Sequence, residues 1–175
     1  MAKTSTLGTI EVRHELCHGC RACEIACSIR CEGSVMPSAS RIRVYQVDPG
    51  PLDIPVLCRQ CADYPCVAAC PPRVGALEVD RRTGAVLPDG EKCLGEKCGR
   101  CARACPQQSA VFFHPVTGKA SVCDLCGGQP ACVGACPTGA LSFIPGSSFD
   151  GRHGAAPAGD LAADLALRLF GQNAD

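Results

Sequence analysis

Apolar and polar positions follow regular patterns only over short stretches of the chain. Residues 41–47 (RIRVYQV) alternate between the two kinds of side chain, which predicts a β-strand with one buried face. Short apolar runs at 76–79, 110–113 and 140–143 each follow a Cys-Pro pair, and we expect each to form a short strand after a helical turn. Leucines recur every fourth residue over 161–170, a spacing typical of an amphipathic helix. The predicted elements are therefore few and short.

Two Thr-Gly pairs mark predicted turns. Thr83-Gly84 separates Leu77–Val79 from Ala85–Leu87, so these two segments are expected to pair as a hairpin. Thr117-Gly118 supplies a similar turn further along the chain.

The last thirty residues differ in composition from the rest. Residues 145–160 are rich in Gly, Pro, Ser and Ala and predict a flexible linker. Asp160 is a candidate N-cap for the helix over 161–170, which begins a helical tail over 161–175. A helix this short is marginal by itself. It either packs on its own domain or docks on a partner, and the sequence leaves both alternatives open.

The composition of this chain is poor in the large aromatic residues that usually fill a hydrophobic core. Among 175 residues there are 17 cysteines, no Trp and only 4% aromatic residues, although aromatic side chains normally supply much of the buried area. An odd number of tightly clustered cysteines argues against a disulfide framework. Residues 1–10 also lack the apolar segment of a secretory signal. We therefore expect a cytoplasmic protein whose cysteines bind metal.

Sixteen of the cysteines form four runs, each with three closely spaced residues and a fourth that follows after three more. The runs are Cys17, Cys20, Cys23, Cys27; Cys58, Cys61, Cys66, Cys70; Cys93, Cys98, Cys101, Cys105; and Cys123, Cys126, Cys132, Cys136. This is the spacing of bacterial ferredoxins, in which proline follows the fourth cysteine. Proline does so in the last three runs, whereas Ser28 follows in the first. Zinc sites usually join two separated Cys-x-x-Cys pairs, which fits this pattern poorly.

The spacing predicts four [4Fe–4S] clusters arranged in pairs. Three close cysteines wrap one cube and the fourth reaches the neighbouring cube. We expect the fourth cysteine at the start of a short helix, with proline in its first turn. Thiolates would occupy every iron, so no catalytic site is expected and electron transfer is the remaining task. Cys31, outside the runs, is either a small buried thiol or an alternative ligand to Cys27.

Charge and hydropathy exclude two other classes of function. Lys and Arg number 17 against 17 Asp and Glu, so there is no basic excess to indicate nucleic-acid binding. No apolar run approaches the ~20 residues of a transmembrane helix. Each oxidised cluster with its four thiolates adds a charge of about −2, which brings the loaded protein to roughly −8.

Over about residues 10–144 the chain resembles the four-cluster, polyferredoxin-type subunits of molybdenum and tungsten oxidoreductases. The resemblance is carried by HGCRACEIAC at 18–27, SRIRVYQV at 40–47, CRQC at 58–61, CVAACP at 66–71, TGAV at 83–86, TGKASVCDLCGG at 117–128 and CPTGAL at 136–141. This short version is most similar to the small iron–sulfur subunit of bacterial tungsten aldehyde oxidoreductase.

The resemblance implies that the outer two runs share a pair of clusters and the inner two runs share another. The implied ligand sets are Cys17, Cys20, Cys23, Cys136 (cluster 1); Cys123, Cys126, Cys132, Cys27 (cluster 2); Cys58, Cys61, Cys66, Cys105 (cluster 3); and Cys93, Cys98, Cys101, Cys70 (cluster 4). The implied fold is α+β, with two ferredoxin-like dicluster units, one inserted in the other. The outer unit spans about 10–47 and 116–144, and the inner unit about 53–114.

The resemblance also implies a function. Such a subunit relays single electrons between a large tungsten- or molybdenum-pterin subunit that oxidises aldehydes and a flavin subunit or other acceptor. The alternatives are the iron–sulfur subunit of a formate dehydrogenase, hydrogenase or carbon-monoxide dehydrogenase, or a free polyferredoxin. Self-association of protomers into a conducting chain stays open as well.

Overall fold

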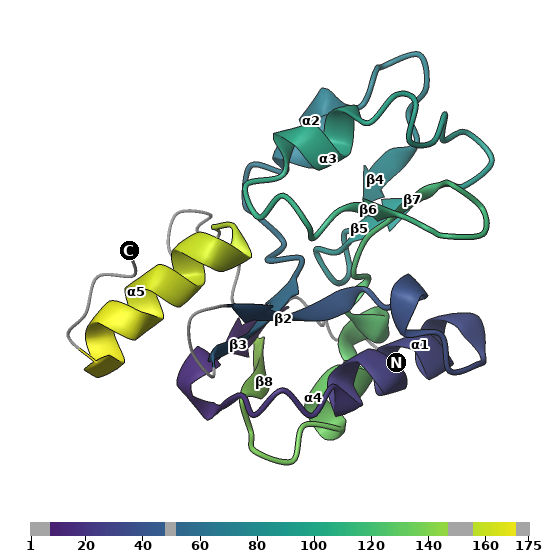
Figure 1. Ribbon diagram of the computed structural model, residues 1–175. Coiled ribbons are helices and arrows are strands. Elements are labelled where there is room, and N and C mark those ends of the chain that lie inside the picture. Colours follow the sequence, from purple (N-terminus) through teal and green to yellow (C-terminus); the bar gives the residue numbers. More distant parts are fainter. Residues whose placement is uncertain (1–7, 48–51, 147–155, 171–175) are drawn as a thin grey trace.

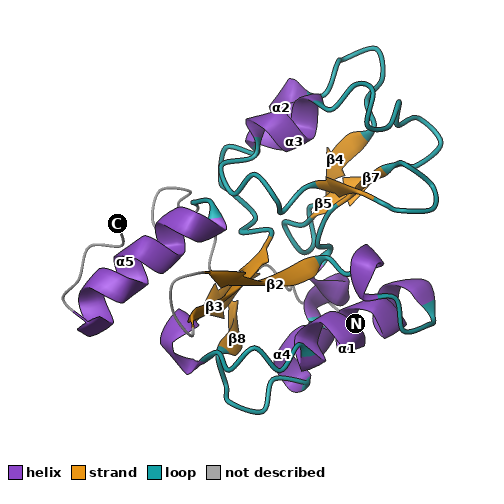
Figure 2. Cartoon of the chain, in the orientation of Figure 1, coloured by secondary structure: helices purple, strands orange, loops and turns teal. Residues whose placement is uncertain are grey.

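The computed structural model describes residues 8–47, 52–146 and 156–170 (Figure 1). Its α-helices are α1 (Ala22–Glu32), α2 (Pro65–Ala69), α3 (Arg100–Ala104), α4 (Ala131–Gly134) and α5 (Ala158–Phe170). Its strands are β1 (Gly8–Val12), β2 (Ile42–Val47), β3 (Leu52–Leu57), β4 (Leu77–Val79), β5 (Val86–Pro88), β6 (Phe112–Phe113), β7 (Ala120–Ser121) and β8 (Leu141–Pro145). Loops connect these short elements (Figure 2), which confirms the predicted α+β class with little regular secondary structure.

The strands form four separate antiparallel pairs: β1 with β8, β2 with β3, β4 with β5, and β6 with β7. The hairpin predicted around Thr83-Gly84 is present, with Leu77 opposite Pro88 and Val79 opposite Val86. The strand predicted over 41–47 is β2. The sequence pattern does not predict its partner β3, because Pro55 within that strand reads as a break.

In the second and third motifs the fourth cysteine lies at the end of a short helix, so the prediction that it begins one is wrong there. Cys66 lies in the first turn of α2, and Cys70 is the C-cap of that helix. Cys105 caps α3 in the same way. The following proline disfavours helical backbone in the residue before it, so each helix stops at its cysteine. The third and fourth cysteines are thus held at opposite ends of one helical turn.

Helix α1 shows what happens where this proline is absent. Ser28 follows Cys27, and α1 runs for 11 residues in all, ending at Glu32 before Gly33 caps it with a left-handed backbone (φ 71°). Ser28 is fully buried, and its hydroxyl accepts a hydrogen bond from the Met36 N–H at 3.1 Å. The longer helix places Cys31 one turn beyond Cys27.

The helices pack in two pairs that follow the order of the motifs. α1 packs against α4, and β1 pairs with β8, so the two ends of the motif region are joined. α2 packs against α3 in the upper part of Figure 1, whereas α1 and α4 lie in the lower part. These contacts agree with an inner unit inserted in an outer one, which stays our prediction for the domain boundaries.

Cysteines occupy much of the main core. That core includes Ile10, Leu57, Val86, Val122 and Leu125, all nearly inaccessible to solvent. The buried cysteines among them are Cys23, Cys27, Cys58, Cys66, Cys93, Cys101, Cys123 and Cys132. Aliphatic residues from short strands therefore surround the metal-binding motifs, in place of an aromatic core.

Helix α5 packs on its own domain, the first of the two alternatives. Ala162 and Leu165 form a second buried cluster with Ile54 and Val56 of β3. The helix begins at Ala158, so the predicted N-cap Asp160 lies inside its first turn. There its negative charge interacts favourably with the positive end of the helix dipole. Most of the predicted linker, residues 147–155, lies outside the described residues. Among the described helices, none has the length and apolar character needed to cross a membrane.

Candidate iron–sulfur centres

Left-handed backbone turns the chain inside each cysteine motif. Gly19, Gln60, Gly99 and Cys126 have φ values of 63°, 51°, 56° and 50° and lie between cysteines of the first, second, third and fourth motif. Glycine adopts this conformation readily, whereas a non-glycine residue there costs about 1–3 kcal/mol. Gln60 and Cys126 therefore carry local strain that the surrounding motif must offset. The turns let three closely spaced side chains face one hollow.

Three hollows are each lined by four cysteines, three from one motif and the fourth from another. They enclose about 320, 350 and 330 Å³, including space open to solvent. The cysteines in these hollows are Cys17, Cys20, Cys23 and Cys136; Cys58, Cys61, Cys66 and Cys105; and Cys70, Cys93, Cys98 and Cys101. The structure thus brings together the residues of three implied ligand sets.

The remaining four cysteines also lie close together. Burial, followed by the nearby charges of Cys27 and Cys126, raises the pKa of the Cys132 thiol to about 12. Burial is likewise the main cause of the raised pKa of Cys123, to which Cys132 and Cys27 contribute. Cys27 from the first motif is therefore a neighbour of the three close cysteines of the fourth.

The shape of these sites fits a group larger than one ion. Within residues 8–47, 52–146 and 156–170, no three His, Cys, Asp or Glu side chains converge closely enough to hold a single metal ion. The cysteines line hollows whose other walls are mostly apolar, such as Val86 and Val111 in one and Val74 and Leu77 in another. Thiolate sulfurs spread around an apolar hollow match the ligand set of an iron–sulfur cube.

The protonation of the buried thiols points to the same conclusion. Burial raises the pKa of Cys58 well above its ordinary value, and it raises that of Cys66 to about 11 and that of Cys23 to about 12. Without a cationic partner these groups stay protonated at neutral pH. Iron supplies the positive charge that stabilises thiolates, so loading the sites releases protons.

Backbone N–H groups donate to several of these sulfurs. The Arg41 N–H donates to Cys27 Sγ at 3.3 Å, and the Gly95 and Ala120 N–H groups each donate to Cys93 Sγ at 3.4 Å. Such bonds to ligand sulfur raise the reduction potential of a cluster, since they stabilise added negative charge.

Cys31 lies against Cys27. The Cys31 thiol, one helical turn further along α1, acts as a donor toward Cys27 and lowers the pKa of Cys27 despite its burial, and the Arg41 N–H adds to this effect. The Arg41 guanidinium forms an ion pair at 2.8 Å with Asp124, whose other oxygen accepts from the Cys126 N–H at 2.9 Å. Sequence reasoning missed this Arg41–Asp124 bridge between two motifs. The only local signal is Asp two residues before Cys126, a spacing typical of an Asx turn.

Thiols of different implied ligand sets lie close enough for the charge of one to affect the other. Burial is the main cause of the raised pKa values of several thiols, and in three cases a thiol of another set adds to it. These pairs are Cys23 with Cys132, Cys123 with Cys58, and Cys101 with Cys66. The sets of clusters 1, 2, 3 and 4 are therefore consecutive neighbours.

Comparison with known proteins agrees with this geometry. The family model for the 4Fe-4S dicluster domain matches residues 52–145. The polyferredoxin-like subunit of aliphatic sulfonate oxidoreductase from Pyrococcus furiosus is 42% identical over 168 residues, which cover 94% of each protein. The electron transfer subunit of thiosulfate reductase from Salmonella typhi is 35% identical over 142 residues, covering 73% of this protein and 70% of that subunit.

Among solved structures, the active site complex BamBC of benzoyl coenzyme A reductase contains a similar chain. The TM-score is 0.48 at 25% identity, with 94% of this chain and 91% of that chain covered.

This protein belongs to the 4Fe-4S dicluster domain family. Within that family it is a polyferredoxin-type electron-transfer subunit of an oxidoreductase, without a catalytic site of its own. Its sixteen motif cysteines are consistent with four [4Fe–4S] clusters, as predicted.

Proposed function

We propose that this chain relays single electrons through four [4Fe–4S] clusters between a catalytic subunit and an electron acceptor. The observation that carries this proposal is the repeated arrangement of three cysteines from one motif with the fourth of another around each apolar hollow. When bound, the clusters supply one-electron redox chemistry. The polypeptide holds them, keeps water from them and sets their potentials through hydrogen bonds to sulfur.

The ligand assignment is part of the proposal. Cluster 1 takes Cys17, Cys20, Cys23 and Cys136; cluster 2 takes Cys123, Cys126, Cys132 and Cys27; cluster 3 takes Cys58, Cys61, Cys66 and Cys105; and cluster 4 takes Cys93, Cys98, Cys101 and Cys70. Three of these sets are supported by shared hollows and the second by the proximity of its thiols. Cys27 serves as the ligand and Cys31 as its hydrogen-bond donor.

The order of the ligand sets defines the path of the electron. Close thiols link cluster 1 to 2, 2 to 3 and 3 to 4, so clusters 1 and 4 are the two ends. Short hops between neighbours then connect partners docked at those ends. Either direction of transfer uses the same path.

The identity of the partners rests on resemblance. We propose a large tungsten- or molybdenum-pterin subunit that oxidises aldehydes as one partner, with a flavin subunit as the other. The sulfonate oxidoreductase relative supports a second candidate, in which the catalytic subunit acts on an aliphatic sulfonate. A formate dehydrogenase, hydrogenase or carbon-monoxide dehydrogenase partner, a free polyferredoxin and a self-associated chain are the further alternatives.

One purification tests these candidates. The tagged chain is isolated without oxygen from its own host. The mass of the complex and its content of tungsten, molybdenum and flavin are determined. Its activity is then assayed with aldehydes and with aliphatic sulfonates. A pterin subunit active on aldehydes supports the main proposal, and activity on sulfonates alone supports the second candidate. A chain recovered with no other subunit contradicts both and indicates a free or self-associated polyferredoxin.

A further inference from the structure

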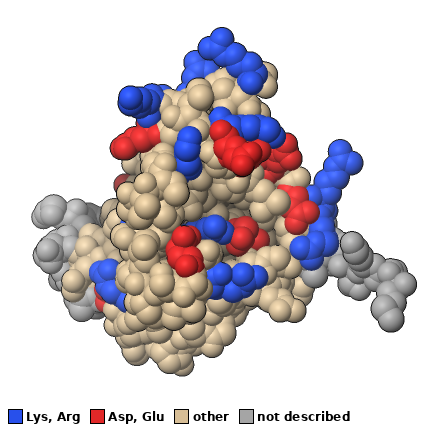
Figure 3. Space-filling view, turned by 90° about the vertical axis from the view of Figure 1, so that its right-hand side faces the viewer, with Lys and Arg blue, Asp and Glu red and all other residues tan. Residues whose placement is uncertain are grey.

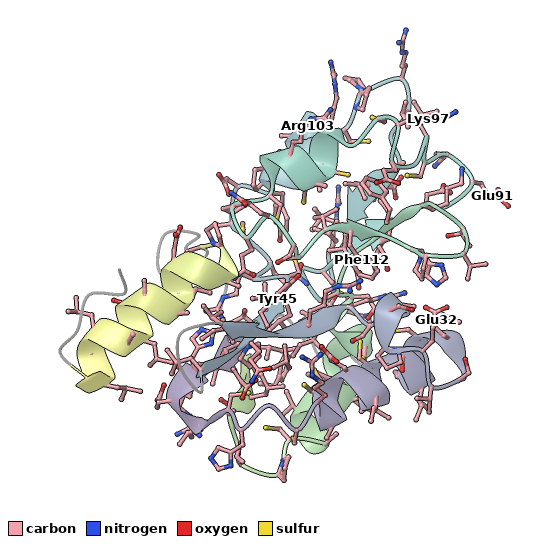
Figure 4. The ribbon with its side chains drawn as sticks, in the orientation of Figure 1. Glu32, Tyr45, Glu91, Lys97, Arg103 and Phe112 are labelled. Atoms are coloured by element: carbon pink, nitrogen blue, oxygen red, sulfur yellow. The ribbon has the colours of Figure 1, made fainter. Side chains whose placement is uncertain are left out.

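The surface around the proposed cluster 4 is basic. The two segments that border its hollow, residues 70–77 and 93–105, contain four cations and one anion. These charged residues are Arg73, Lys97, Arg100, Arg103 and Glu96, and all five are exposed. Lys and Arg side chains project from the upper end of the molecule in Figure 3, and Lys97 and Arg103 point outward there in Figure 4. We call Arg73, Lys97, Arg100 and Arg103 the basic rim.

Most of the basic rim has no counter-charge in the described part of the chain. Arg73, Lys97 and Arg100 form no ion pair with another described residue. Arg103 differs, because its guanidinium donates to the Cys98 carbonyl at 2.7 Å and supports the motif. Lys92 nearby is paired with Asp89 at 2.9 Å. Three of the four cations of the basic rim therefore have no ion-pair partner among the described residues, and one of them, Arg100, lines the hollow itself.

The opposite end of the electron path is balanced in charge. Beside the proposed cluster 1, Arg21 pairs with Glu24 at 3.4 Å, the Asp53 carboxylate lies against Gly19, and the Arg13 guanidinium donates to the Gly139 carbonyl at 2.9 Å. The charge excess thus distinguishes the cluster 4 end from the cluster 1 end. Neutralising the charge of bound clusters does not account for this difference, because both ends hold a cluster of the same kind.

An exposed apolar residue sits among these cations. Leu94 is 61% exposed and lines the cluster 4 hollow together with Cys98 and Arg100. Apolar contact at the centre with charged groups around it is the usual anatomy of a protein interface. Complementary charge in such a rim mainly accelerates association and selects the partner.

We propose that the basic rim and Leu94 dock an acidic redox protein, which exchanges electrons with cluster 4. This inference rests on the proposed electron path. Carboxylates of the partner face Lys97 and Arg100, and an apolar residue of the partner covers Leu94. One electron leaves the reduced chain and reduces a one-electron flavin or iron–sulfur centre of the partner, and no bond forms or breaks.

The test is a stopped-flow measurement with the loaded protein. The dithionite-reduced chain is mixed with an oxidised acidic flavodoxin, whose flavin absorbance can be followed, at several ionic strengths. Electrostatic steering changes association rates by about 10–10³-fold and weakens with salt. We expect the second-order rate constant to fall at least tenfold on going from low to high salt.

Variants locate the effect. The double variant Lys97→Glu/Arg100→Glu is compared with Arg81→Glu/Arg168→Glu, which makes the same charge change on exposed residues of the β4–β5 turn and of α5. The first is expected to lose at least tenfold in rate at low salt and to lose its salt dependence, while the control stays within twofold of the unmodified chain. Equal losses in both variants, or no loss in the first, would overturn the docking site.

Iron content separates this inference from the proposed function. If the charge-reversal variant loses iron, the milder variant Lys97→Gln/Arg100→Gln is used in its place. Its second-order rate constant is expected to fall at least threefold at low salt. An unmodified chain that holds all four clusters but shows a salt-independent rate overturns the docking site and leaves the electron relay standing. A chain that binds no clusters overturns the relay itself.

Discussion

The hydrogen bond from Cys31 to Cys27 offers a sharp test of how this protein sets the potential of one cluster. Cys31 lies one helical turn after Cys27 on α1, an arrangement that exists because Ser28 replaces the usual proline. This position lets its thiol act as a donor toward Cys27, which lowers the pKa of Cys27. The reduced cluster carries one more negative charge, so it accepts this bond more strongly than the oxidised cluster does. Replacing Cys31 by Ala should lower the potential of cluster 2.

The magnitude follows from the kind of donor. A hydrogen bond to a charged acceptor contributes about 1.5–3 kcal/mol, and a thiol is a weak donor. We take this hydrogen bond to be about 1 kcal/mol stronger in the reduced cluster than in the oxidised one. Losing it then lowers the one-electron reduction potential by roughly 40 mV.

Potentiometric EPR titration of the loaded protein measures this shift. Cys31→Ala should move one of the four redox transitions to lower potential, and Cys31→Ser, which keeps a donor, should restore most of it. Four unchanged transitions in both variants would refute the hydrogen-bond role. Loss of about four irons in Cys31→Ala would show instead that Cys31, and not Cys27, is the ligand.

Three further predictions concern the fold and the loading of the sites. Leu165→Ala should destabilise the docking of α5 by about 2–5 kcal/mol, seen as faster hydrogen exchange in that helix, while Leu169→Ala, at a residue 51% exposed, should have little effect. Gly19→Ala should cost the chain one cluster, because its backbone is left-handed and the added methyl would meet the Asp53 carboxylate; unchanged iron content would contradict this. Cluster assembly should strengthen as pH rises toward the raised thiol pKa values, about 12 for Cys23, since protons bound to the empty thiols are released on loading. Iron retention during chelation that does not change between pH 6 and about 9 would be the opposite result.

Local patterns in the sequence suffice for the features that depend on neighbouring residues. The four cysteine runs, the alternating strand over 41–47 and the hairpin around Thr83-Gly84 all follow from spacing and turn chemistry. The paired use of motifs comes only from a family resemblance, because spacing within a motif does not determine which distant cysteine completes its set.

The features that sequence patterns miss depend on packing or on the end of a helix. β1 pairs with β8 from the other end of the motif region, and β3 forms despite Pro55, because tertiary contacts override a local break. The sequence predicts that a helix begins at Cys70, where one in fact ends, since proline is tolerated in the first turn as well as after the last. The Arg41–Asp124 ion pair joins residues far apart in sequence and leaves no periodic signal.

Iron and acid-labile sulfide in protein purified without oxygen test the central claim most directly. Four clusters require about sixteen atoms of each per chain, and stepwise Cys→Ser replacement within any ligand set should remove about four of each. An iron and sulfide content near eight atoms of each per chain, or zinc in the place of iron, would contradict the four-cluster electron path.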